Sequence, residues 1–165
     1  CRELKNPVIF AEHALLYSSR GEVPDSPYKI ALGVADVKRA GADVTIASYS
    51  RMVQVSLAAA EQLAGEGIQA EVIDLRTLRP LDTDTVVESV AKTHHLVVVE
   101  ETSQFGGFAG EVVSQVQRKG FDYLNAPIER VAGEEVPIPY SMPLERLAIP
   151  DAQRVVQAAR RLLES

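Results

Sequence analysis

Three short apolar runs recur along the middle of the chain at nearly constant spacing. They are VTIASY (44–49), AEVIDL (70–75) and HLVVVE (95–100), and their first residues lie about 26 positions apart. Runs of this length that are rich in β-branched residues are typical of buried strands. The spacing leaves room for a helix that crosses back between successive strands, so the pattern predicts parallel pairing.

The stretches between these runs carry apolar residues at helical spacing. The first predicted helix has Ser50 as its N-cap and ends at Gly65. Its apolar face would comprise Met52, Val53, Val55, Ala59, Ala60 and Leu63. The second predicted helix starts near Asp82, with Thr85 and Glu88 in capping-box spacing.

Four further elements complete the alternation of strands and helices. They are a helix over 108–119, a strand over 128–133, a helix from about Pro150 onward, and an edge strand within 31–41 that could run antiparallel. Lys38 and Arg39 in that edge strand would discourage further pairing. The sequence therefore predicts an α/β fold, a three-layer sandwich in which helices cover both faces of a parallel or mixed sheet.

The N-terminal part of the chain has a different organisation. NPVIFAEH (6–13) has the composition of a strand but has no earlier strand to pair with. The following residues, 18–30, contain Ser, Gly, Asp and two prolines, which is typical of a linker. We therefore expect residues 1–17 to be the last strand of a truncated domain, and residues 31–165 to form the domain that follows the linker.

Charge and composition limit the kinds of partner and location that the chain can have. The chain has 17 Lys and Arg residues against 23 Asp and Glu residues, and the net charge of -6 disfavours nucleic acid and anionic lipid while favouring a basic protein partner. No run of apolar residues is long enough to span a membrane. The single cysteine, Cys1, cannot form an internal disulfide, which fits a reducing cytosol.

Candidate chemistry should lie in the loops after the strands, where open α/β sheets bind ligands. The glycines of EETSQFGGFAGE (100–111) lack phosphate-binding spacing, which favours a tight corner over an anion site. Adjacent Glu100 and Glu101 would point to opposite faces, so they do not suggest an acid/base pair. Arg76 and Arg79 could bind an anion, but pairing with Asp74, Asp82 or Asp84 in a structural corner is favoured.

Several stretches together resemble a known family. NPVIFAEHALLY, AEVIDLRTLRPLDTDTVVESVAKTHHLVVVEE, QFGGFAGEV and YLNAPIERVAGEEVPIPY are similar to the C-terminal half of the beta subunit of pyruvate dehydrogenase, the decarboxylating component. The resemblance implies a transketolase C-terminal-type domain with a mixed, mostly parallel five-stranded sheet. It also implies that residues 1–17 end a truncated pyrimidine-binding domain. Catalytic, cofactor-binding and metal-binding residues would lie outside this chain, in the parent assembly that holds thiamine diphosphate and Mg²⁺.

The same resemblance implies partners and a role. The partners would be a second beta subunit, with a homodimer expected for this chain, an alpha subunit, and the peripheral subunit-binding domain of the dihydrolipoyl acyltransferase. Docking would involve Asn125, Glu134 and Glu164, where Asn125 replaces the aspartate that is common in the family. The expected location is cytoplasmic or stroma-like. The alternatives are a subunit acting on acetoin or branched-chain 2-oxo acids, and a free-standing anion-binding module that uses Arg76 and Arg79.

Overall fold

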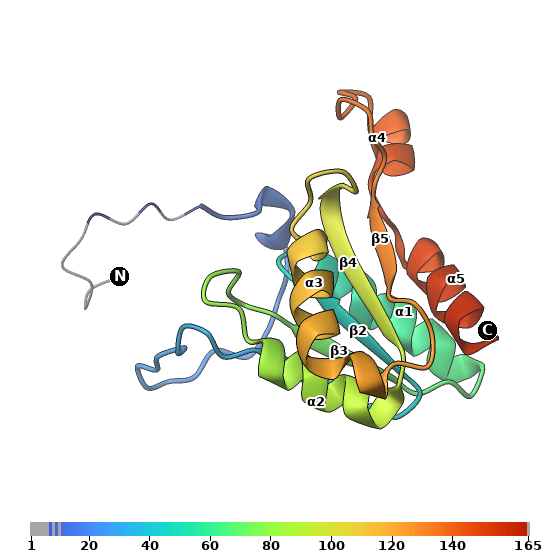
Figure 1. Cartoon of the computed structure of the whole chain (residues 1–165). Helices are drawn as coiled ribbons and strands as arrows, with labels where there is room; N and C mark the ends of the chain where they lie inside the picture. The colour runs from blue at the N-terminus through green and yellow to red at the C-terminus, as the bar shows by residue number, and fades with distance from the viewer. Residues whose placement is uncertain (1–6, 8, 10, 165) are drawn as a thin grey trace.

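The computed structural model describes residues 7, 9 and 11–164, and these contain one mixed sheet of five strands in the order β1-β3-β2-β4-β5 (Figure 1). The strands are β1 Asp36–Arg39, β2 Val44–Ser48, β3 Ala70–Asp74, β4 Leu96–Ser103 and β5 Glu129–Gly133. Strands β3, β2, β4 and β5 pair in parallel, and β1 pairs antiparallel with β3. The predicted mixed, mostly parallel sheet and the antiparallel edge strand are therefore confirmed.

Helices cover both faces of the sheet, as the sequence predicted. The helices are α1 Met52–Gly65, α2 Thr83–Thr93, α3 Ala109–Gly120, α4 Met142–Ala148 and α5 Ala152–Leu163, with short 3-10 turns η1 Ala14–Leu16 and η2 Phe121–Tyr123. Helices α1 and α5 pack on one face and α2 and α3 on the other (Figure 1). Successive side chains of a strand point to opposite faces of the sheet, so one strand contributes to the hydrophobic core on each face. In β4, Val97 and Val99 face α1 and α5, while Leu96 and Val98 face α2 and α3.

Two predicted helix caps are wrong. Ser50 has a φ of 54°, and its side chain does not cap α1, which begins after Arg51 without a side-chain cap bond. Helix α2 is capped by Asp82, whose carboxylate accepts a hydrogen bond from the backbone N–H of Thr85, so Thr85 and Glu88 do not form a capping box. The aspartate prevails because it lies directly before the first helical residue, where its oxygen reaches the free N–H groups.

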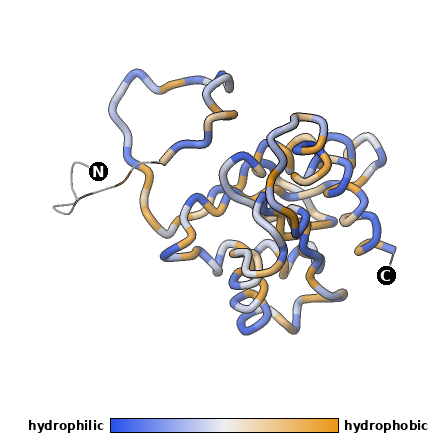
Figure 2. The backbone as a smooth tube through the Cα atoms, turned by 90° about the horizontal axis from the view of Figure 1, so that it is seen from above, coloured by the Kyte–Doolittle hydropathy of each residue, from blue (hydrophilic) through white to orange (hydrophobic). Residues whose placement is uncertain are grey.

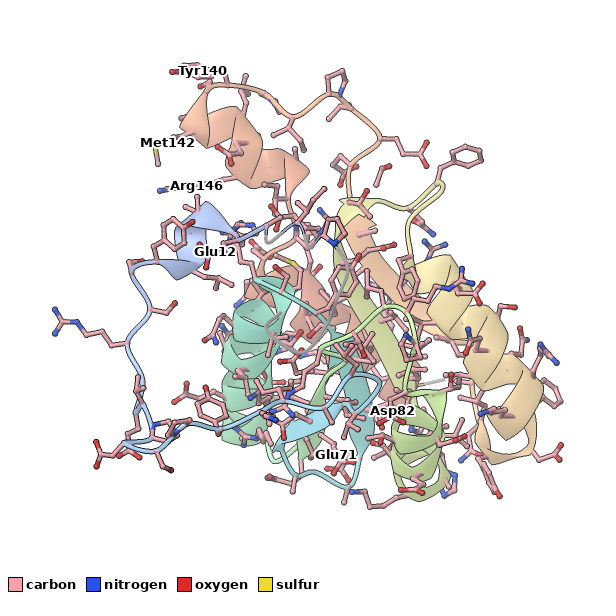
Figure 3. All side chains as sticks on the ribbon, turned by 90° about the vertical axis from the view of Figure 1, so that its left-hand side faces the viewer. Glu12, Glu71, Asp82, Tyr140, Met142 and Arg146 are labelled. Atoms are coloured by element: carbon pink, nitrogen blue, oxygen red, sulfur yellow. The ribbon has the colours of Figure 1, made fainter. Side chains whose placement is uncertain are left out.

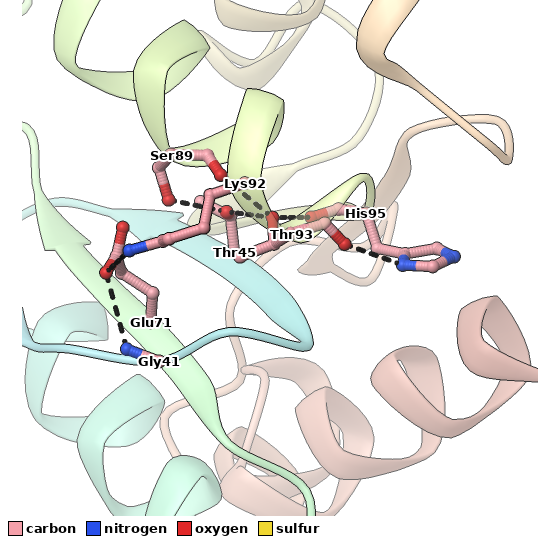
Figure 4. Close-up of polar contacts among 7 residues, drawn as sticks. All are labelled: Gly41, Thr45, Glu71, Ser89, Lys92, Thr93 and His95. Carbon is pink, nitrogen blue, oxygen red and sulfur yellow. Dashed lines mark hydrogen bonds and ion pairs between the residues drawn. The ribbon is translucent and has the colours of Figure 1, made fainter.

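A buried polar cluster joins α2 to β2 and β3 (Figure 4). The hydroxyl of Thr45 in β2 lies 2.6 Å from the hydroxyls of both Ser89 and Thr93, all three being buried. Beside them, the buried carboxylate of Glu71 in β3 is paired with the ammonium group of Lys92 in α2. Because each of these groups has a partner, the cluster fixes the position of α2 on the sheet without leaving a buried polar group unsatisfied.

The N-terminal segment lies beside the α/β body rather than within it. Residues 18–30 are exposed and follow an irregular path, which Figure 2 shows as a wide loop with hydrophobic positions among hydrophilic ones. The predicted terminal strand falls partly on residues 1–6, 8 and 10, which are outside the described residues. Within the described part, residues 14–16 form η1. The assignment of residues 1–17 to a truncated upstream domain stays a prediction, as does the division into domain and linker.

Candidate functional site

The carboxyl ends of the parallel strands meet at one edge of the sheet, and Glu100 is the buried charge at that edge. Its side chain is fully buried in the second half of β4, just past the last residue that pairs with β2, and its carboxylate accepts hydrogen bonds from the backbone N–H of Ala109 at 2.9 Å and the Tyr49 hydroxyl at 3.4 Å. Arg130 in β5 pairs with the same carboxylate, with 3.0 Å between Nη2 and Oε1. The Glu100 carboxylate therefore lies at the N-terminus of α3, in the position that a bound anion would otherwise take.

The glycines of the β4–α3 loop make room for this carboxylate. A Cβ atom at Gly107 would lie well inside van der Waals contact of the Glu100 carboxylate, so only glycine fits at that position. Gly106 has a φ of 73°, a conformation that other residues rarely adopt. The prediction of a tight corner in preference to an anion site agrees with this geometry.

Tyr49 lies next to the buried carboxylate of Glu100. Burial of its hydroxyl and the negative charge of Glu100 raise the pKa of Tyr49 to about 12. Its ring packs edge-on against Phe108, with centroids 6.3 Å apart. Tyr49 thus stays a neutral hydrogen-bond donor throughout the ordinary pH range.

Glu101, the next residue, faces a different set of groups, as the alternation of a strand requires. Its carboxylate lies 3.0 Å from Nε2 of His13 and 3.9 Å from the guanidinium of Arg51. The backbone N–H of Leu15 donates to Nδ1 of His13, so Nε2 carries the proton that points to Glu101. This contact attaches the N-terminal segment to the carboxyl end of the sheet, an association between residues 88 positions apart that the sequence did not predict.

A cavity of about 360 Å³ lies between the N-terminal segment and α4. Leu15, Arg51, Met142, Glu145 and Arg146 contribute to its lining, together with residues 149–151. Figure 3 shows Met142 and Arg146 on α4 directly above the segment that carries Glu12. The cavity combines apolar walls with charges of both signs.

The two arginines of the β3–α2 corner differ: the Arg76 side chain forms an ion pair, and the Arg79 side chain is exposed to solvent. The guanidinium of Arg76 lies 2.6 Å from Oδ2 of Asp36 in β1, and its backbone N–H donates to the Asp74 side chain. The predicted partners of the arginines were Asp74, Asp82 and Asp84, so the pairing with Asp36 corrects that expectation. Arg79 is exposed, and its side chain has no hydrogen bond or ion pair within the described residues. An anion-binding role for the two arginines stays a prediction.

The three predicted docking residues lie at two ends of the domain. Glu134 directly follows β5 at the carboxyl end and pairs with Arg154 at 3.2 Å. Asn125 precedes β5, and Glu164 caps the far end of α5. A contact of 3.4 Å between Arg161 and Glu129 joins the last turns of α5 to the start of β5. The structure thus places Asn125 and Glu164 at the same end and Glu134 at the opposite end.

Asn125 lines an apolar hollow of about 470 Å³. The hollow lies between α3 and the segment leading into β5, and its apolar lining includes Val113, Phe121, Leu124, Pro127 and Ile128. The Asn125 side chain is exposed, while its backbone N–H donates to the carbonyl of His94. This position makes Asn125 an accessible polar group at the rim of an apolar depression, the arrangement found at many protein interfaces.

Metal-binding and membrane-spanning features are absent from the part of the chain that the structure describes. Across residues 7, 9 and 11–164 there is no group of three or more His, Cys, Asp or Glu side chains that could hold a metal ion. Within the same residues no helix has both the length and the apolar character needed to cross a membrane.

Comparison with known proteins defines the class of this domain. The family model described as "Transketolase, C-terminal domain" matches residues 33–155. A solved structure described as "Split gene transketolase, inactive beta4 tetramer" has a TM-score of 0.75 and 30% identity, and the match covers 88% of this chain and 46% of that chain. The chain therefore belongs to the transketolase C-terminal domain family.

Curated relatives sharpen the resemblance. The chain is 46% identical over 157 residues to "Pyruvate dehydrogenase E1 component subunit beta" of Rickettsia felis, covering 95% of this chain and 48% of the relative. It is 47% identical over 160 residues to the mitochondrial subunit beta-1 of Arabidopsis thaliana, covering 94% and 44%. It is also 48% identical over 159 residues to "Acetoin:2,6-dichlorophenolindophenol oxidoreductase subunit beta" of Cupriavidus necator, covering 96% and 47%. The resemblance seen in the sequence is confirmed, and the chain spans about half the length of these relatives.

Proposed function

We propose that the chain serves as the C-terminal domain of the beta subunit in a thiamine-diphosphate-dependent pyruvate dehydrogenase, where it supports subunit assembly and carrier docking. The parent reaction would be oxidative decarboxylation of pyruvate with acyl transfer to lipoyl groups. The similarity to beta subunits over some 95% of the chain supports the assignment. The chemistry would take place on residues outside this chain.

The observation that supports the proposal is that the acidic side chains at the carboxyl end of the sheet are paired with other residues of the chain. Catalytic groups in an α/β fold are expected at this edge, where they must be able to reach a substrate. Glu100 is instead buried against Arg130, and Glu101 is engaged by His13. These pairs hold the loops and the N-terminal segment in place, so the edge has a structural role in this domain. Thiamine diphosphate and Mg²⁺ are accordingly assigned to the parent assembly.

The proposed docking surface for the acyltransferase lies at the end of the domain that carries Asn125 and Glu164. The apolar hollow next to Asn125 would receive apolar side chains, and Glu164 would attract a basic partner such as the peripheral subunit-binding domain. The remaining proposed partners are an alpha subunit and a second beta subunit. A cytoplasmic location also stays a prediction.

Two alternatives keep specific support. The 48% identity to the acetoin oxidoreductase subunit favours a related beta subunit that acts on another substrate. A free-standing anion-binding module would rely on Arg76 and Arg79, and only Arg79 is unengaged within the described residues. A module of that kind would bind phosphate in the absence of any partner chain and would melt at a higher temperature with it.

The docking proposal is tested by titrating the chain with a purified peripheral subunit-binding domain at low and high salt. Glu164→Lys should weaken binding several-fold at low salt, with a smaller effect at high salt, because the attraction is screened. Glu134→Lys tests whether that predicted docking residue, at the opposite end, also contributes, and Glu61→Lys is the control that makes the same charge change on exposed α1. Equal effects of Glu164→Lys and Glu61→Lys would show that only net charge matters and would contradict a localised docking site.

A further inference from the structure

The cavity between the N-terminal segment and α4 has the size of a site for a small metabolite. Its volume of about 360 Å³ lies near the lower end of the roughly 300–1,000 Å³ that is typical of ligand pockets. Its apolar wall is built from three separate parts of the chain: Leu15 of η1, Met142 of α4, and Ile149, which is buried between α4 and α5. Leu15 and Met142 are more than half exposed, so an apolar ligand group placed against this wall would remove both from water.

The α4 side of the cavity carries one charge of each sign. Glu145 and Arg146 are consecutive residues of α4 that both line the cavity, and neither side chain has a hydrogen bond or ion pair within the described residues. Asp151 also lines the cavity, but it is occupied as the N-cap of α5, where its carboxylate accepts a hydrogen bond from the backbone N–H of Arg154 at 2.9 Å. The α4 side therefore offers a carboxylate and a guanidinium that are both available to a ligand.

Arg51, which directly precedes α1, adds a second guanidinium to the lining. Its ion pair with Glu101 is long, with 3.9 Å between Nη1 and Oε1. A guanidinium has five N–H donors in a planar fork, which suits the two oxygens of a carboxylate. Arg51 thus keeps donors that a ligand carboxylate can use.

The part of the wall that η1 contributes is already held in place. The backbone N–H of Leu15 donates to Nδ1 of His13 at 3.3 Å, and Nε2 of the same ring lies 3.0 Å from the Glu101 carboxylate. These contacts attach η1 to the sheet without a ligand. Binding would therefore order few additional groups, which lowers its entropic cost.

We propose that this cavity binds an apolar α-amino acid in its zwitterionic form. Arg51 and Arg146 hold the α-carboxylate, Glu145 accepts hydrogen bonds from the α-ammonium group, and the ligand side chain lies against the apolar wall. The charges of both signs favour a zwitterion over a simple anion, because an anion would leave the Glu145 carboxylate unpaired beside it. The bound amino acid joins η1 to α4 and so attaches the N-terminal segment more firmly. This site does not depend on the proposed assembly role.

Isothermal titration calorimetry of the 165-residue chain with L-leucine tests the site. We expect L-leucine to bind, and two analogues of the same shape to bind at least about tenfold more weakly: 4-methylpentanoate, which lacks the ammonium group, and 3-methylbutylamine, which lacks the carboxylate. Hydrogen exchange gives a second measurement. The backbone N–H groups of Leu16 and Tyr17, which are bonded within the η1 turn, should exchange more slowly when L-leucine is bound.

Matched variants separate a lost contact from a general charge effect. Glu145→Gln and Arg146→Gln should each weaken L-leucine binding at least about tenfold. Glu61→Gln on exposed α1 and Arg118→Gln on exposed α3 make the same charge changes elsewhere and should leave the affinity unchanged. Thermal melts should show that every variant is folded.

Three results would overturn the site. They are no L-leucine binding to the folded chain at millimolar concentration, equal binding of L-leucine and 4-methylpentanoate, and wild-type affinity in both α4 variants. None of these results bears on the proposed assembly role, which is tested by reconstitution with partner chains.

Discussion

Glu100 and Arg130 connect the β4–α3 corner to β5 through a contact of 3.0 Å between Oε1 and Nη2. The carboxylate is fully buried, and Arg130 retains about a fifth of its side-chain exposure. The guanidinium also donates to the carbonyl of Gln104 at 2.7 Å, so it holds the loop as well as the strand. Removal of one partner would leave a charge in an apolar setting, where it is costly.

Arg130→Met should lower the free energy of unfolding by about 3 kcal/mol, because Glu100 would remain buried without its counter-charge. Urea denaturation at neutral pH measures the change. Arg118→Met, which removes an exposed arginine from α3, should change stability by less than about 0.5 kcal/mol. Similar losses in the two variants would show that the buried pair has no special importance.

Gly107→Ala should destabilise the domain by about 1–3 kcal/mol, since its methyl group would overlap the Glu100 carboxylate and displace the corner. Gly110→Ala is the matched change three residues later, inside α3, where a Cβ atom would meet its nearest neighbour, Arg130, at 3.8 Å. That variant should stabilise the helix by up to about 1 kcal/mol. Thermal melts of both variants provide the comparison, and a reversed order would contradict the account of the loop.

Glu71 makes stability depend on pH in the acid range. Burial raises the pKa of Glu71, but hydrogen bonds from Lys92, Ser89 and the Gly41 N–H lower it more, so that the net pKa lies below the ordinary value of 4.5. A carboxylate with a lowered pKa contributes stability that is fully present well above the ordinary value and is lost as the pH falls through the lower, folded-state value.

Glu71→Gln should therefore reduce stability at pH 7 and weaken the acid dependence below about pH 4.5. Chemical denaturation at a series of pH values measures both effects. Glu61→Gln, on the exposed surface of α1, should reproduce neither. If the stability of Glu71→Gln fell with decreasing pH as steeply as that of the wild type, the buried pair with Lys92 would not contribute to the pH dependence.

The two arginines of the β3–α2 corner should differ in their effects. Arg76→Ala removes the pair with Asp36 and should cost about 0.5–1 kcal/mol, whereas Arg79→Ala should cost less than about 0.5 kcal/mol. Asp36→Ala should cost at least as much as Arg76→Ala, because it also removes the contact with Lys38 at 2.6 Å, and the double variant Arg76→Ala/Asp36→Ala should cost little more than Asp36→Ala alone. Equal losses in Arg76→Ala and Arg79→Ala would contradict the division between an engaged and an exposed side chain.

The sheet could be predicted from the sequence because buried parallel strands leave a strong local signal. Runs such as LVVV before Glu100 are apolar on both faces, and the helices between them have regular periodicity. The segment 136–147, which contains most of α4, left no comparable signal, since its large apolar residues are exposed and its prolines interrupt any helical pattern. Ser50 was assigned as a cap from its residue type, but its backbone has a positive φ that the sequence does not reveal.

The site was less predictable because its contacts join distant positions. Arg76 pairs with Asp36 only because β1 lies beside β3, and that neighbourhood depends on the strand order. His13 meets Glu101 only after the N-terminal segment has folded back onto the sheet. The separation of Glu134 from Asn125 and Glu164 also follows from the strand direction, which residue types alone do not specify.

The most direct test of the central proposal is an assay of pyruvate-dependent reduction of an artificial electron acceptor with thiamine diphosphate and Mg²⁺. The chain would be assayed alone, and then together with an alpha subunit and a separately expressed pyrimidine-binding half of a related beta subunit. We expect activity only when all three chains are present. Pyruvate turnover by this chain alone would contradict the assignment of an assembly and docking role.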